Sequence, residues 1–454
     1  MGTRMGANIK RLFGTDGIRG MADVFPLDAQ TMRAVGASLA RRMGEKLGRQ
    51  PRLLTGRDTR ESGPRIEREL TTGVTESVGF CRSAGVMTTP GIAYLTRHFG
   101  FDAGVVISAS HNPFDDNGIK IFAPSGKKIG ESAELAIEGD IFSSQHTSFL
   151  SADTEVIEQP GADFAYLEHL AAHSDGLDLH GMKIVLDCSN GAASSLAPEL
   201  FKRLGANVNA IHATPDGRNI NRDCGSLHMS DLQQKVISEK ADIGIAFDGD
   251  ADRALFVDEK GTLVDGDGAL WALCRWMTGR GELANKTVVA TVMSNIGLEL
   301  ALKSAGLDLL RAPVGDRFVL EELLKTGSEI GGEQSGHIIF PAISLVGDGI
   351  MSAICVLEAV QATGGSLSKA VEGFVRYPQI LVNVKVREKQ PFESVSKIAD
   401  AAQRVERQLN GSGRLLLRYS GTENLARVMI EGQDQAAIES QANELAGVIR
   451  AELG

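Results

Sequence analysis

Two short stretches of the 454-residue sequence place hydroxyls, carboxylates or a histidine at the end of an apolar run. The first is "GVVISASHNPFDDNGIKIF", in which Ser108, Ser110 and His111 follow apolar residues. The ends of strands in open α/β sheets are where ligands bind, so this pattern predicts serines presented at a strand end. A serine hydrolase is excluded, because there is no G-x-S-x-G elbow and the adjacent His111 would point away from Ser110. A plain polar junction is the alternative.

The second stretch is "DGDADR", residues 248–253, between two apolar runs. Its three aspartates at alternate positions can converge on one hard cation, and we predict Mg²⁺. A calcium EF-hand competes, since Glu259 falls at the twelfth position of such a loop. Two features argue against an EF-hand. Arg253 occupies the position at which an EF-hand requires glycine, and the segments on either side of the loop resemble strands, whereas an EF-hand requires helices. A solvated acidic turn stays open, although it leaves the repulsion among the carboxylates unrelieved.

Two further loops offer hydrogen-bonding groups to a polar ligand. "GGEQSGH", residues 331–337, places Glu333 and Ser335 among glycines that allow close approach. "RYSGTEN", residues 418–424, contains a guanidinium, two hydroxyls and the amide of Gly421, which together could hold a phosphate. Either loop by itself is equally typical of an ordinary turn or hairpin.

The composition narrows the class of protein. A chain of this length suggests about three domains, and 43% hydrophobic with 23% charged residues is typical of globular proteins. The net charge of −11 argues against a nucleic-acid or anionic-membrane surface. Without a long apolar stretch or a signal-peptide core, the sequence predicts a cytoplasmic protein. Five scattered cysteines, without the close pairs of zinc or redox sites, are expected to be reduced and mostly buried: Cys81, Cys188, Cys224, Cys274 and Cys355.

Alternation of short β-branched runs with helical patterns predicts βαβ units and a largely parallel sheet. Apolar residues from Met32 to Leu47 recur every three or four positions, which indicates a helix before the strand-like "RLLTG". Residues 143–163 are polar and contain proline and serine, so we expect a connector there. After Tyr377-Pro378 the pattern changes to antiparallel strands followed by a helix, which predicts a small α+β domain.

Taken together and in this order, the four loops resemble the signatures of the α-D-phosphohexomutases: S-H-N-P, D-G-D-x-D-R, G-E-x-S-G-H and R-x-S-G-T-E. The resemblance spans almost the whole chain. "FGTDGIRG" (13–20), Ser108, "SNIGLE" (294–299) and "VGDRFV" (314–319) most resemble the bacterial branch that acts on glucosamine phosphates. The resemblance implies an α/β fold of four domains, three related mixed α/β domains and a smaller C-terminal α+β domain, around a central cleft. The expected domains are 1–160 with the phosphoserine loop, 161–263 with the metal loop, 264–374 with the sugar loop and 375–454 with the phosphate loop.

The same resemblance implies a chemistry. Ser110 would be a phosphoserine whose phosphate completes a Mg²⁺ site with Asp248, Asp250 and Asp252. The enzyme would interconvert glucosamine 6-phosphate and glucosamine 1-phosphate, with a 1,6-bisphosphate as intermediate and activator, in the synthesis of UDP-N-acetylglucosamine and cell-wall precursors. The expected catalytic residues are Ser110, His111, Lys120, Arg19, Arg253 and His337, of which Lys120, His111 and His337 are alternatives for proton handling. The expected substrate-binding residues are Glu333, Ser335, Arg418, Ser420, Gly421, Thr422 and Arg427, with Arg11 also facing the cleft.

The expected partners are a small phosphosugar and, in a homodimer, a second copy, with no nucleic acid and no membrane. The sequence departs from the family pattern at Asp115, Tyr419 and Asn424, which affects loop rigidity and not the named ligands. A Mg²⁺-dependent phosphatase and an inactive sugar-phosphate binding protein are the rivals from other classes. Phosphoglucomutase and phosphomannomutase activities are the alternatives within the enzyme class.

Overall fold

The computed structural model describes residues 12–14, 16–143, 154–174, 176–420 and 423–454. Three residues with expected ligand roles, Arg11, Gly421 and Thr422, lie outside the described residues. The chain forms two compact units. The first consists of Met1–Val292 with Leu310–Glu372, and the second of Met293–Leu309 with Gly373–Gly454.

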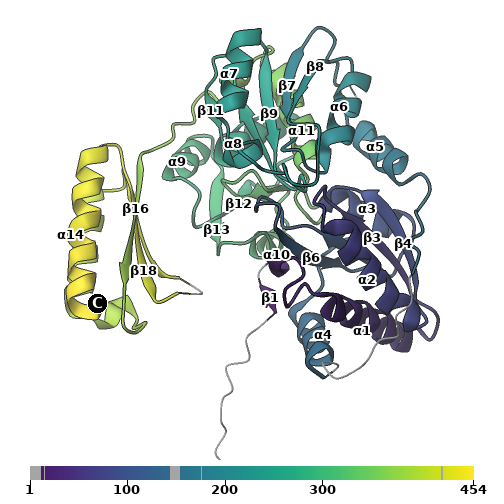
Figure 1. Cartoon of the computed structure of the whole chain (residues 1–454). Helices are drawn as coiled ribbons and strands as arrows, with labels where there is room; N and C mark the ends of the chain where they lie inside the picture. Colours follow the sequence, from purple (N-terminus) through teal and green to yellow (C-terminus); the bar gives the residue numbers. More distant parts are fainter. Residues whose placement is uncertain (1–11, 15, 144–153, 175, 421–422) are drawn as a thin grey trace, which may run out of the picture. The chain divides into compact units, whose positions relative to one another are not determined.

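The first sheet has six strands in the order β1-β2-β6-β5-β3-β4 (Figure 1). β3 pairs parallel with β4 and β5, whereas β6 pairs antiparallel with β5 and β2. The strands are β1 Phe13–Gly14, β2 Gly17–Met21, β3 Arg52–Arg57, β4 Phe80–Val86, β5 Ala103–Ile107 and β6 Asp116–Phe122. The helices are α1 Ala29–Leu47, α2 Gly63–Glu76, α3 Thr89–His98 and α4 Glu131–Ser143.

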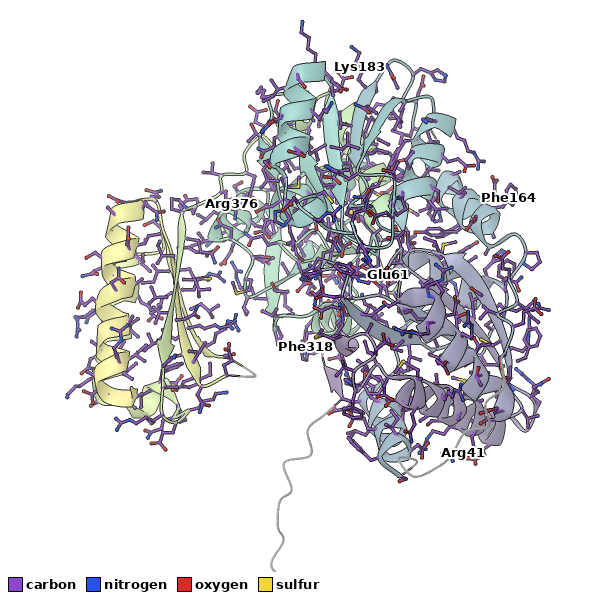
Figure 2. The ribbon with its side chains drawn as sticks, viewed as in Figure 1. Arg41, Glu61, Phe164, Lys183, Phe318 and Arg376 are labelled. Atoms are coloured by element: carbon purple, nitrogen blue, oxygen red, sulfur yellow. The ribbon has the colours of Figure 1, made fainter. Side chains whose placement is uncertain are left out.

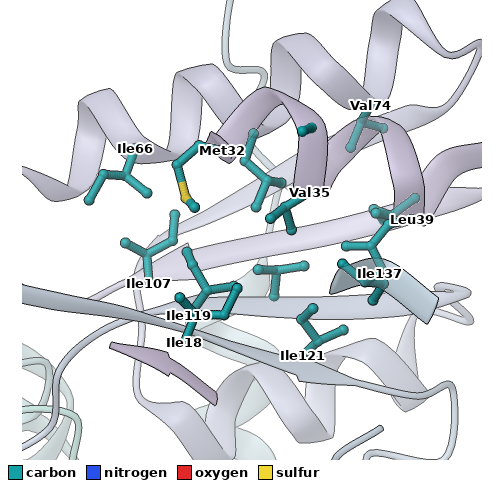
Figure 3. Close-up of a cluster of buried hydrophobic side chains, with 14 of the residues drawn as sticks. Ile18, Met32, Val35, Leu39, Ile66, Val74, Ile107, Ile119, Ile121 and Ile137 are labelled. Carbon is teal, nitrogen blue, oxygen red and sulfur yellow. The ribbon is translucent and has the colours of Figure 1, made fainter. Parts of the chain in front are cut away.

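Strand alternation separates the two faces of this sheet. Ile107, Ile119 and Ile121 pack with Met32 and Val35 of α1 in one buried cluster (Figure 3). On the other face, Gly56 of β3 lies against Ile92 of α3, so closely that a Cβ there would be 2.4 Å from the isoleucine side chain. The sheet is therefore covered on both sides, as expected of buried parallel strands.

The second sheet has five strands in the order β11-β10-β9-β7-β8. β7 pairs parallel with β8 and β9, and β10 pairs antiparallel with β9. The strands are β7 Lys183–Asp187, β8 Asn207–Ile211, β9 Ile243–Phe247, β10 Ala254–Val257 and β11 Leu263–Val264. The helices are α5 Ala162–Ala172, α6 Ala193–Arg203, the 3₁₀ turn η1 Gly225–Leu227 and α7 Ser230–Glu239. Glu61, which precedes α2 and is labelled in Figure 2, forms an ion pair with Arg218 of this domain at 2.8 Å.

The third sheet has the order β13-β12-β14-β15, with β12 and β14 parallel and β14 and β15 antiparallel. Its strands are β12 Thr287–Thr291, β13 Asp308–Ala312, β14 Gly331–Gly332 and β15 Ile338–Ile339. The helices along this part of the chain are α8 Gly266–Arg280, α9 Ile296–Ser304, α10 Asp316–Thr326, α11 Gly349–Ala362 and α12 Leu367–Ala370.

One strand order recurs in the three sheets: β6-β5-β3-β4, β10-β9-β7-β8 and β15-β14-β12-β13. The first two strands of each series form an antiparallel hairpin. The loops of these hairpins are 108–115, 248–253 and 333–337, which are three of the four loops singled out in the sequence. The expectation of three related mixed α/β domains is confirmed. The expectation of a largely parallel sheet is wrong for the strands that follow these loops, because a short loop returns the chain antiparallel.

The second unit contains a three-stranded antiparallel sheet in the order β16-β18-β17. α14 packs along this sheet with α13 beside it (Figure 1). The elements are β16 Gln379–Lys385, the 3₁₀ turn η2 Phe392–Ser394, α13 Ser396–Leu409, β17 Arg414–Tyr419, β18 Leu425–Glu431 and α14 Gln435–Leu453. The predicted small α+β domain is confirmed, and α13 is an element that the sequence analysis did not predict.

All five cysteines are buried and carry free thiols, as expected. Among the helices of the described ranges, none combines the length and the hydropathy that a membrane crossing requires.

Candidate active site

Ser110 lies in the loop that follows β5 and is held in a left-handed backbone conformation, with φ of 51°. Its N–H donates to Oγ of Ser108 at 2.9 Å, and its carbonyl accepts a hydrogen bond from Nδ2 of Asn221 at 2.9 Å. A non-glycine residue rarely adopts this conformation, so the surrounding contacts must impose it. The Ser110 hydroxyl, which is buried, donates a hydrogen bond to Oδ2 of Asp248.

A buried ion pair contacts the loop that contains Ser110. Asp58 pairs with Arg60, and Oγ of Ser108 donates to Oδ2 of Asp58 at 2.6 Å. The Arg60 guanidinium also donates to the carbonyl of Asn112 at 2.6 Å. Both charged side chains are fully buried. Because removing one member of a buried pair leaves an uncompensated charge, this pair fixes the backbone on both sides of Ser110.

Asp248, Asp250 and Asp252 lie in the hairpin loop between β9 and β10, and all three are buried. One carboxylate oxygen from each lies within 4.8 Å of the others. Gly249 permits the close approach of this loop to the serine loop, since a Cβ there would be 2.5 Å from the carbonyl oxygen of Ser110. Two hairpin loops from different sheets therefore meet at Ser110.

Lys120 of β6 supplies the cation that faces this acidic loop. Its Nζ lies 2.8 Å from Oδ2 of Asp250, 3.1 Å from Oδ2 of Asp252 and 3.2 Å from Oδ2 of Asp16. Burial lowers the pKa of Lys120, but the three carboxylates outweigh burial and raise the pKa well above its ordinary value. Lys120 is therefore a permanent positive charge. Lys128 continues the network, with Nζ 2.6 Å from Oδ2 of Asp316.

The three aspartates differ in how strongly the positive charge of Lys120 acts on their pKa values. Burial raises the pKa of Asp248 well above its ordinary value, and the charges of Asp252 and Asp250 add to the effect. Burial also opposes ionisation of Asp252, but Lys120 and His337 outweigh it and hold that pKa well below its usual range. The positive charge of Lys120 is thus concentrated at one side of the loop, whereas Asp248 accepts hydrogen bonds from the Ser110 hydroxyl and, at 3.2 Å, from the N–H of Arg253.

The acidic loop suits a divalent cation, because two of its buried carboxylate oxygens have no hydrogen-bond donor within the described ranges. Oδ1 of Asp250 and Oδ1 of Asp252 are buried and have no hydrogen-bond partner among the described residues. Buried carboxylate oxygens normally have a partner, and hard divalent cations take carboxylate oxygens as ligands. Asp250 and Asp252 therefore offer oxygen ligands close to Ser110 that hydrogen bonds of the described residues do not satisfy.

Three other residues with an expected catalytic role, His111, Arg253 and Arg19, lie near Ser110 and the acidic loop. The expectation that His111 points away from Ser110 is wrong, because Nδ1 of His111 lies 3.2 Å from Oγ of Ser110. The same nitrogen accepts a hydrogen bond from Nη1 of Arg253 at 3.1 Å. Burial lowers the pKa of His111 to about 4, aided by the positive charges of Arg253 and Arg19, so the imidazole is neutral at neutral pH. Arg19 donates to Asp16 and thereby joins the Lys120 network.

His337 is buried at the far side of the acidic loop. Its Nδ1 lies 3.6 Å from Oδ1 of Asp252, and its Nε2 accepts the N–H of Gly347 at 3.0 Å. Burial opposes protonation of His337, but the carboxylates of Asp252 and Asp316 outweigh burial and raise the pKa of His337 above its ordinary value. His337 is therefore placed to orient Asp252 and does not contact Ser110 in the described part of the chain.

Glu333 and Ser335 lie in the hairpin loop between β14 and β15 and are half-buried. Oε1 of Glu333 accepts the N–H of Gly315 at 3.2 Å. The charge of Glu333 also acts on Arg253, whose pKa is reduced by burial but raised overall by Asp252, Asp248 and Glu333. The sugar loop is thereby linked electrostatically to the acidic loop within the first unit.

Arg418 and Arg427 of the second unit face each other across the β17–β18 ladder. Burial lowers the pKa of Arg418, and the charge of Arg427 adds to the effect. Within the described ranges, Arg418 has no carboxylate in ion-pair contact. Nearby, Oγ of Ser420 accepts the N–H of Glu423 at 3.3 Å. Two like charges side by side favour the binding of an anion.

The structure adds residues that the sequence analysis missed. Thr89, at the start of α3, donates its hydroxyl to Oδ2 of Asp250 and its N–H to the Asp250 carbonyl at 3.0 Å. Asp58, Arg60 and Asn221 were also not predicted. A usable signal was present for Asp58 and Arg60, since "RLLTGRDTR" places charges directly after an apolar strand.

The EF-hand alternative fails in the structure. The acidic loop is flanked by β9 and β10, and Glu259 accepts hydrogen bonds from Ser368, including the Ser368 N–H at 3.3 Å.

Two of the residues that depart from the family pattern form hydrogen bonds in the structure. The hydroxyl of Tyr419 donates to the Gln390 carbonyl at 2.5 Å, and the Asn424 carbonyl accepts the N–H of Val386 at 3.0 Å.

Comparisons with known proteins agree with this arrangement. The chain matches the four domains of phosphoglucomutase/phosphomannomutase: alpha/beta/alpha domain I over residues 10–148, domain II over 165–261, domain III over 265–377 and the C-terminal domain over 381–448. A phosphoglucosamine mutase of Solibacter usitatus is 47% identical over 445 residues, covering 98% of this chain and 99% of the relative. A phosphoglucosamine mutase of Koribacter versatilis is 46% identical, covering 98% of each chain.

Among solved structures, a phosphoglucomutase/phosphomannomutase family protein of Burkholderia thailandensis aligns with a TM-score of 0.78 at 23% identity, covering 97% of each chain. At this identity the likeness concerns the fold. Fold, domain matches and relatives together define an enzyme of the isomerase and phosphotransferase type. The chain belongs to the phosphoglucomutase/phosphomannomutase family, within the α-D-phosphohexomutase superfamily.

We predict that Mg²⁺ raises the midpoint of thermal unfolding and that Asp250→Asn removes most of this shift. Binding to the folded state alone contributes about 2.7 kcal/mol at a hundredfold excess over Kd, and the variant loses one charged ligand with little change in volume. Glu259→Gln is the control, because an EF-hand would need Glu259 and the acidic hairpin does not. A Mg²⁺ response that disappears in Glu259→Gln but persists in Asp250→Asn would contradict the assignment.

Proposed function

We propose that this enzyme interconverts glucosamine 6-phosphate and glucosamine 1-phosphate. The curated relatives at 46–47% identity carry the name phosphoglucosamine mutase and cover nearly the whole chain, which supports this substrate. The observation that carries the mechanism is the hydrogen bond from the Ser110 hydroxyl to Asp248, inside a buried group of three aspartates. A nucleophile beside unsatisfied carboxylate oxygens suits phosphoryl transfer better than acyl transfer.

Ser110 carries the phosphoryl group between the two half-reactions. A sugar hydroxyl forms a new P–O bond while the bond from phosphorus to Oγ of Ser110 breaks, which gives a glucosamine 1,6-bisphosphate. The bisphosphate turns over and returns its other phosphoryl group to Ser110. In the first half-reaction one proton passes from the sugar hydroxyl to Oγ, and the neutral Nδ1 of His111, 3.2 Å from Oγ, lies at one end of that path.

Asp248, Asp250 and Asp252 would hold Mg²⁺ together with the phosphate on Ser110. Bound there, Mg²⁺ would neutralise negative charge on the phosphate oxygens. Lys120 and Arg253 provide permanent positive charge next to the same loop, because carboxylates keep their pKa values high. Preorganised charge of this kind is the main source of rate enhancement in phosphoryl transfer.

The remaining loops bind the parts of the substrate that do not react. Glu333 and Ser335 hydrogen-bond ring hydroxyls, and Arg418, Ser420, Gly421, Thr422 and Arg427 bind the phosphate that is not being transferred. The cross-strand arrangement of Arg418 and Arg427 supports an anion site. We further propose a cytoplasmic enzyme, functioning as a homodimer, whose product enters the synthesis of UDP-N-acetylglucosamine and cell-wall precursors. A 1,6-bisphosphate of glucosamine or glucose would activate it by phosphorylating Ser110.

Ser110 should carry covalent phosphate in freshly purified protein, because the proposed cycle begins and ends with the phosphoenzyme. Intact mass and peptide mapping measure this directly. Ser108→Ala is the informative companion variant, since Ser108 is the neighbouring hydroxyl and should not itself be modified. Phosphate that maps to Ser108 alone would show that the nucleophile is assigned wrongly.

Substrate preference is tested by comparing kcat/KM for glucosamine, glucose and mannose phosphates. We expect glucosamine phosphates to be favoured, with isomerisation and no steady release of inorganic phosphate. Ser110→Ala should abolish turnover of all three sugar phosphates. Any activity that remains in this variant would come from a contaminating enzyme. Preference for glucose or mannose phosphate would indicate one of the alternative mutase activities, and stoichiometric phosphate release would indicate a phosphatase.

Arg418→Ala should weaken binding of glucosamine 6-phosphate and glucosamine 1-phosphate about equally, because the sugar presents opposite ends to Ser110 in the two half-reactions. A charge-assisted hydrogen bond contributes about 1.5 to 3 kcal/mol, so affinity should fall roughly ten- to a hundredfold. Equilibrium binding in a Ser110→Ala background measures this without turnover.

Lys385→Ala, at an exposed cation on β16 of the same sheet, is the matched control and should leave both affinities unchanged. Loss of affinity for only one of the two sugar phosphates would mean that the two orientations use separate phosphate pockets.

A further inference from the structure

A second group of metal-ligating side chains lies in the domain of the second sheet: Asp187, His212 and Cys224. One ligand atom from each lies within 4.8 Å of the others. The cysteines are scattered in the sequence, so no spacing motif marks this group. A carboxylate, an imidazole and a thiol in mutual contact are the ligand types that bind zinc.

The fold explains how the three residues meet. β7 and β8 are parallel neighbours, and Asp187 pairs with Ile211 at their ends. His212 follows Ile211 in the chain, so Asp187 and His212 lie at the same edge of the sheet. Cys224 directly precedes η1, and the N–H of Gly225 donates to Oδ2 of Asp187 at 2.9 Å. His212 has a left-handed backbone, with φ of 47°, which turns the chain at this point.

The polar atoms of the group are incompletely satisfied. Nδ1 of His212 lies 3.0 Å from Oδ2 of Asp187, but the two are not aligned as a hydrogen bond, and this buried nitrogen has no other hydrogen-bond partner in the described ranges. Asp187 is fully buried. Its oxygens accept N–H groups from Ser189 and Gly225, and within the described residues no Lys or Arg forms an ion pair with it. Within the described residues the imidazole of His212 is the one cationic group beside Asp187, so a metal ion held by both side chains would compensate the buried carboxylate more fully.

We propose that Asp187, His212 and Cys224 form a zinc site, with water as the fourth ligand. Zinc prefers mixed nitrogen, sulfur and oxygen ligands, whereas Mg²⁺ requires oxygen, so the two metals are separated by ligand type. Nε2 of His212 lies 3.6 Å from Oδ2 of Asp231, which places a carboxylate behind the imidazole as in many zinc sites. An open groove of about 350 Å³ beside His212 and Asp231 gives the metal access from solvent.

Binding displaces the thiol proton of Cys224 to solvent and leaves the imidazole neutral, so the charges of the thiolate and the carboxylate balance the metal ion. Asn221 lies in the segment that ends at Cys224, and its Nδ2 donates to the carbonyls of Ser110 and Asn112, both at 2.9 Å. A metal fixed to Cys224 therefore fixes the segment that holds the serine loop. Its role is structural and does not depend on which sugar phosphate the enzyme uses.

Titration of the metal-free protein with Co²⁺ tests the site, because a thiolate ligand gives a charge-transfer absorption in the near ultraviolet that carboxylate ligands do not give. We expect this absorption in the wild type, its loss in Cys224→Ala, and an affinity for Co²⁺ at least about tenfold lower in His212→Ala. The matched controls are Cys274→Ala, at a buried thiol in α8, and His228→Ala, at an exposed imidazole three residues after Gly225. Both should bind Co²⁺ as the wild type does.

Zn²⁺ provides the second readout. It should raise the unfolding midpoint of Asp250→Asn, in which the acidic loop is impaired, and the shift should be lost when Cys224→Ala is added. The proposal is overturned by a wild type without the charge-transfer absorption, or by an absorption that persists in Cys224→Ala. It is also overturned if the Zn²⁺ shift survives Cys224→Ala. In that case His212 and Asp187 form an ordinary ion pair and the metal binds elsewhere.

Discussion

The compensation of the buried Asp250 and Asp252 by Lys120 is the interaction on which the first unit depends. The aspartates lie in the loop between β9 and β10, whereas Lys120 comes from β6 of a different sheet, with Nζ 2.8 Å from Asp250. Removing one partner from a buried pair costs about 3 to 5 kcal/mol, so neither sheet can present these groups to its own interior without the other. Thr89 adds two hydrogen bonds to Asp250 from the first domain. The candidate site is therefore also the junction of the two domains.

The recurring strand order explains why the chemistry lies where it does. Each of the three sheets contains an antiparallel hairpin at the same place in the recurring strand order, and the hairpin loops carry Ser110, the three aspartates and Glu333. A hairpin loop is held at both ends by the ladder, so its side chains are positioned more firmly than those of a long crossover. The same topological position thus presents the proposed nucleophile in one domain, the proposed cation ligands in the second and the proposed sugar-binding groups in the third.

Local sequence patterns were sufficient for some features and insufficient for others. The strands before Ser108 and Asp248, the helix that contains Met32 and the C-terminal α+β domain could be predicted, because apolar periodicity and turn residues act over a few positions. The partners of Ser110 could not be predicted in the same way. Asn221 and Arg60 reach its carbonyl from other loops, and a contact between distant segments leaves no periodic signal. Asp187, His212 and Cys224 were missed for the same reason, since parallel pairing of β7 and β8 brings the first two together.

The phosphate loop poses a different physical problem from the serine loop. It lies in a unit with its own hydrophobic core, built from residues such as Val428 and Leu445. Arg418 and Arg427 repel each other across two strands, and the strands are stable because that core is formed independently of the charges. In the proposed function, a phosphate bound by Arg418 and Arg427 would relieve this repulsion and would therefore stabilise the unit that binds it. A mutase must bind one phosphate while it transfers the other, and the proposed function assigns the first task to this unit and the second to Ser110.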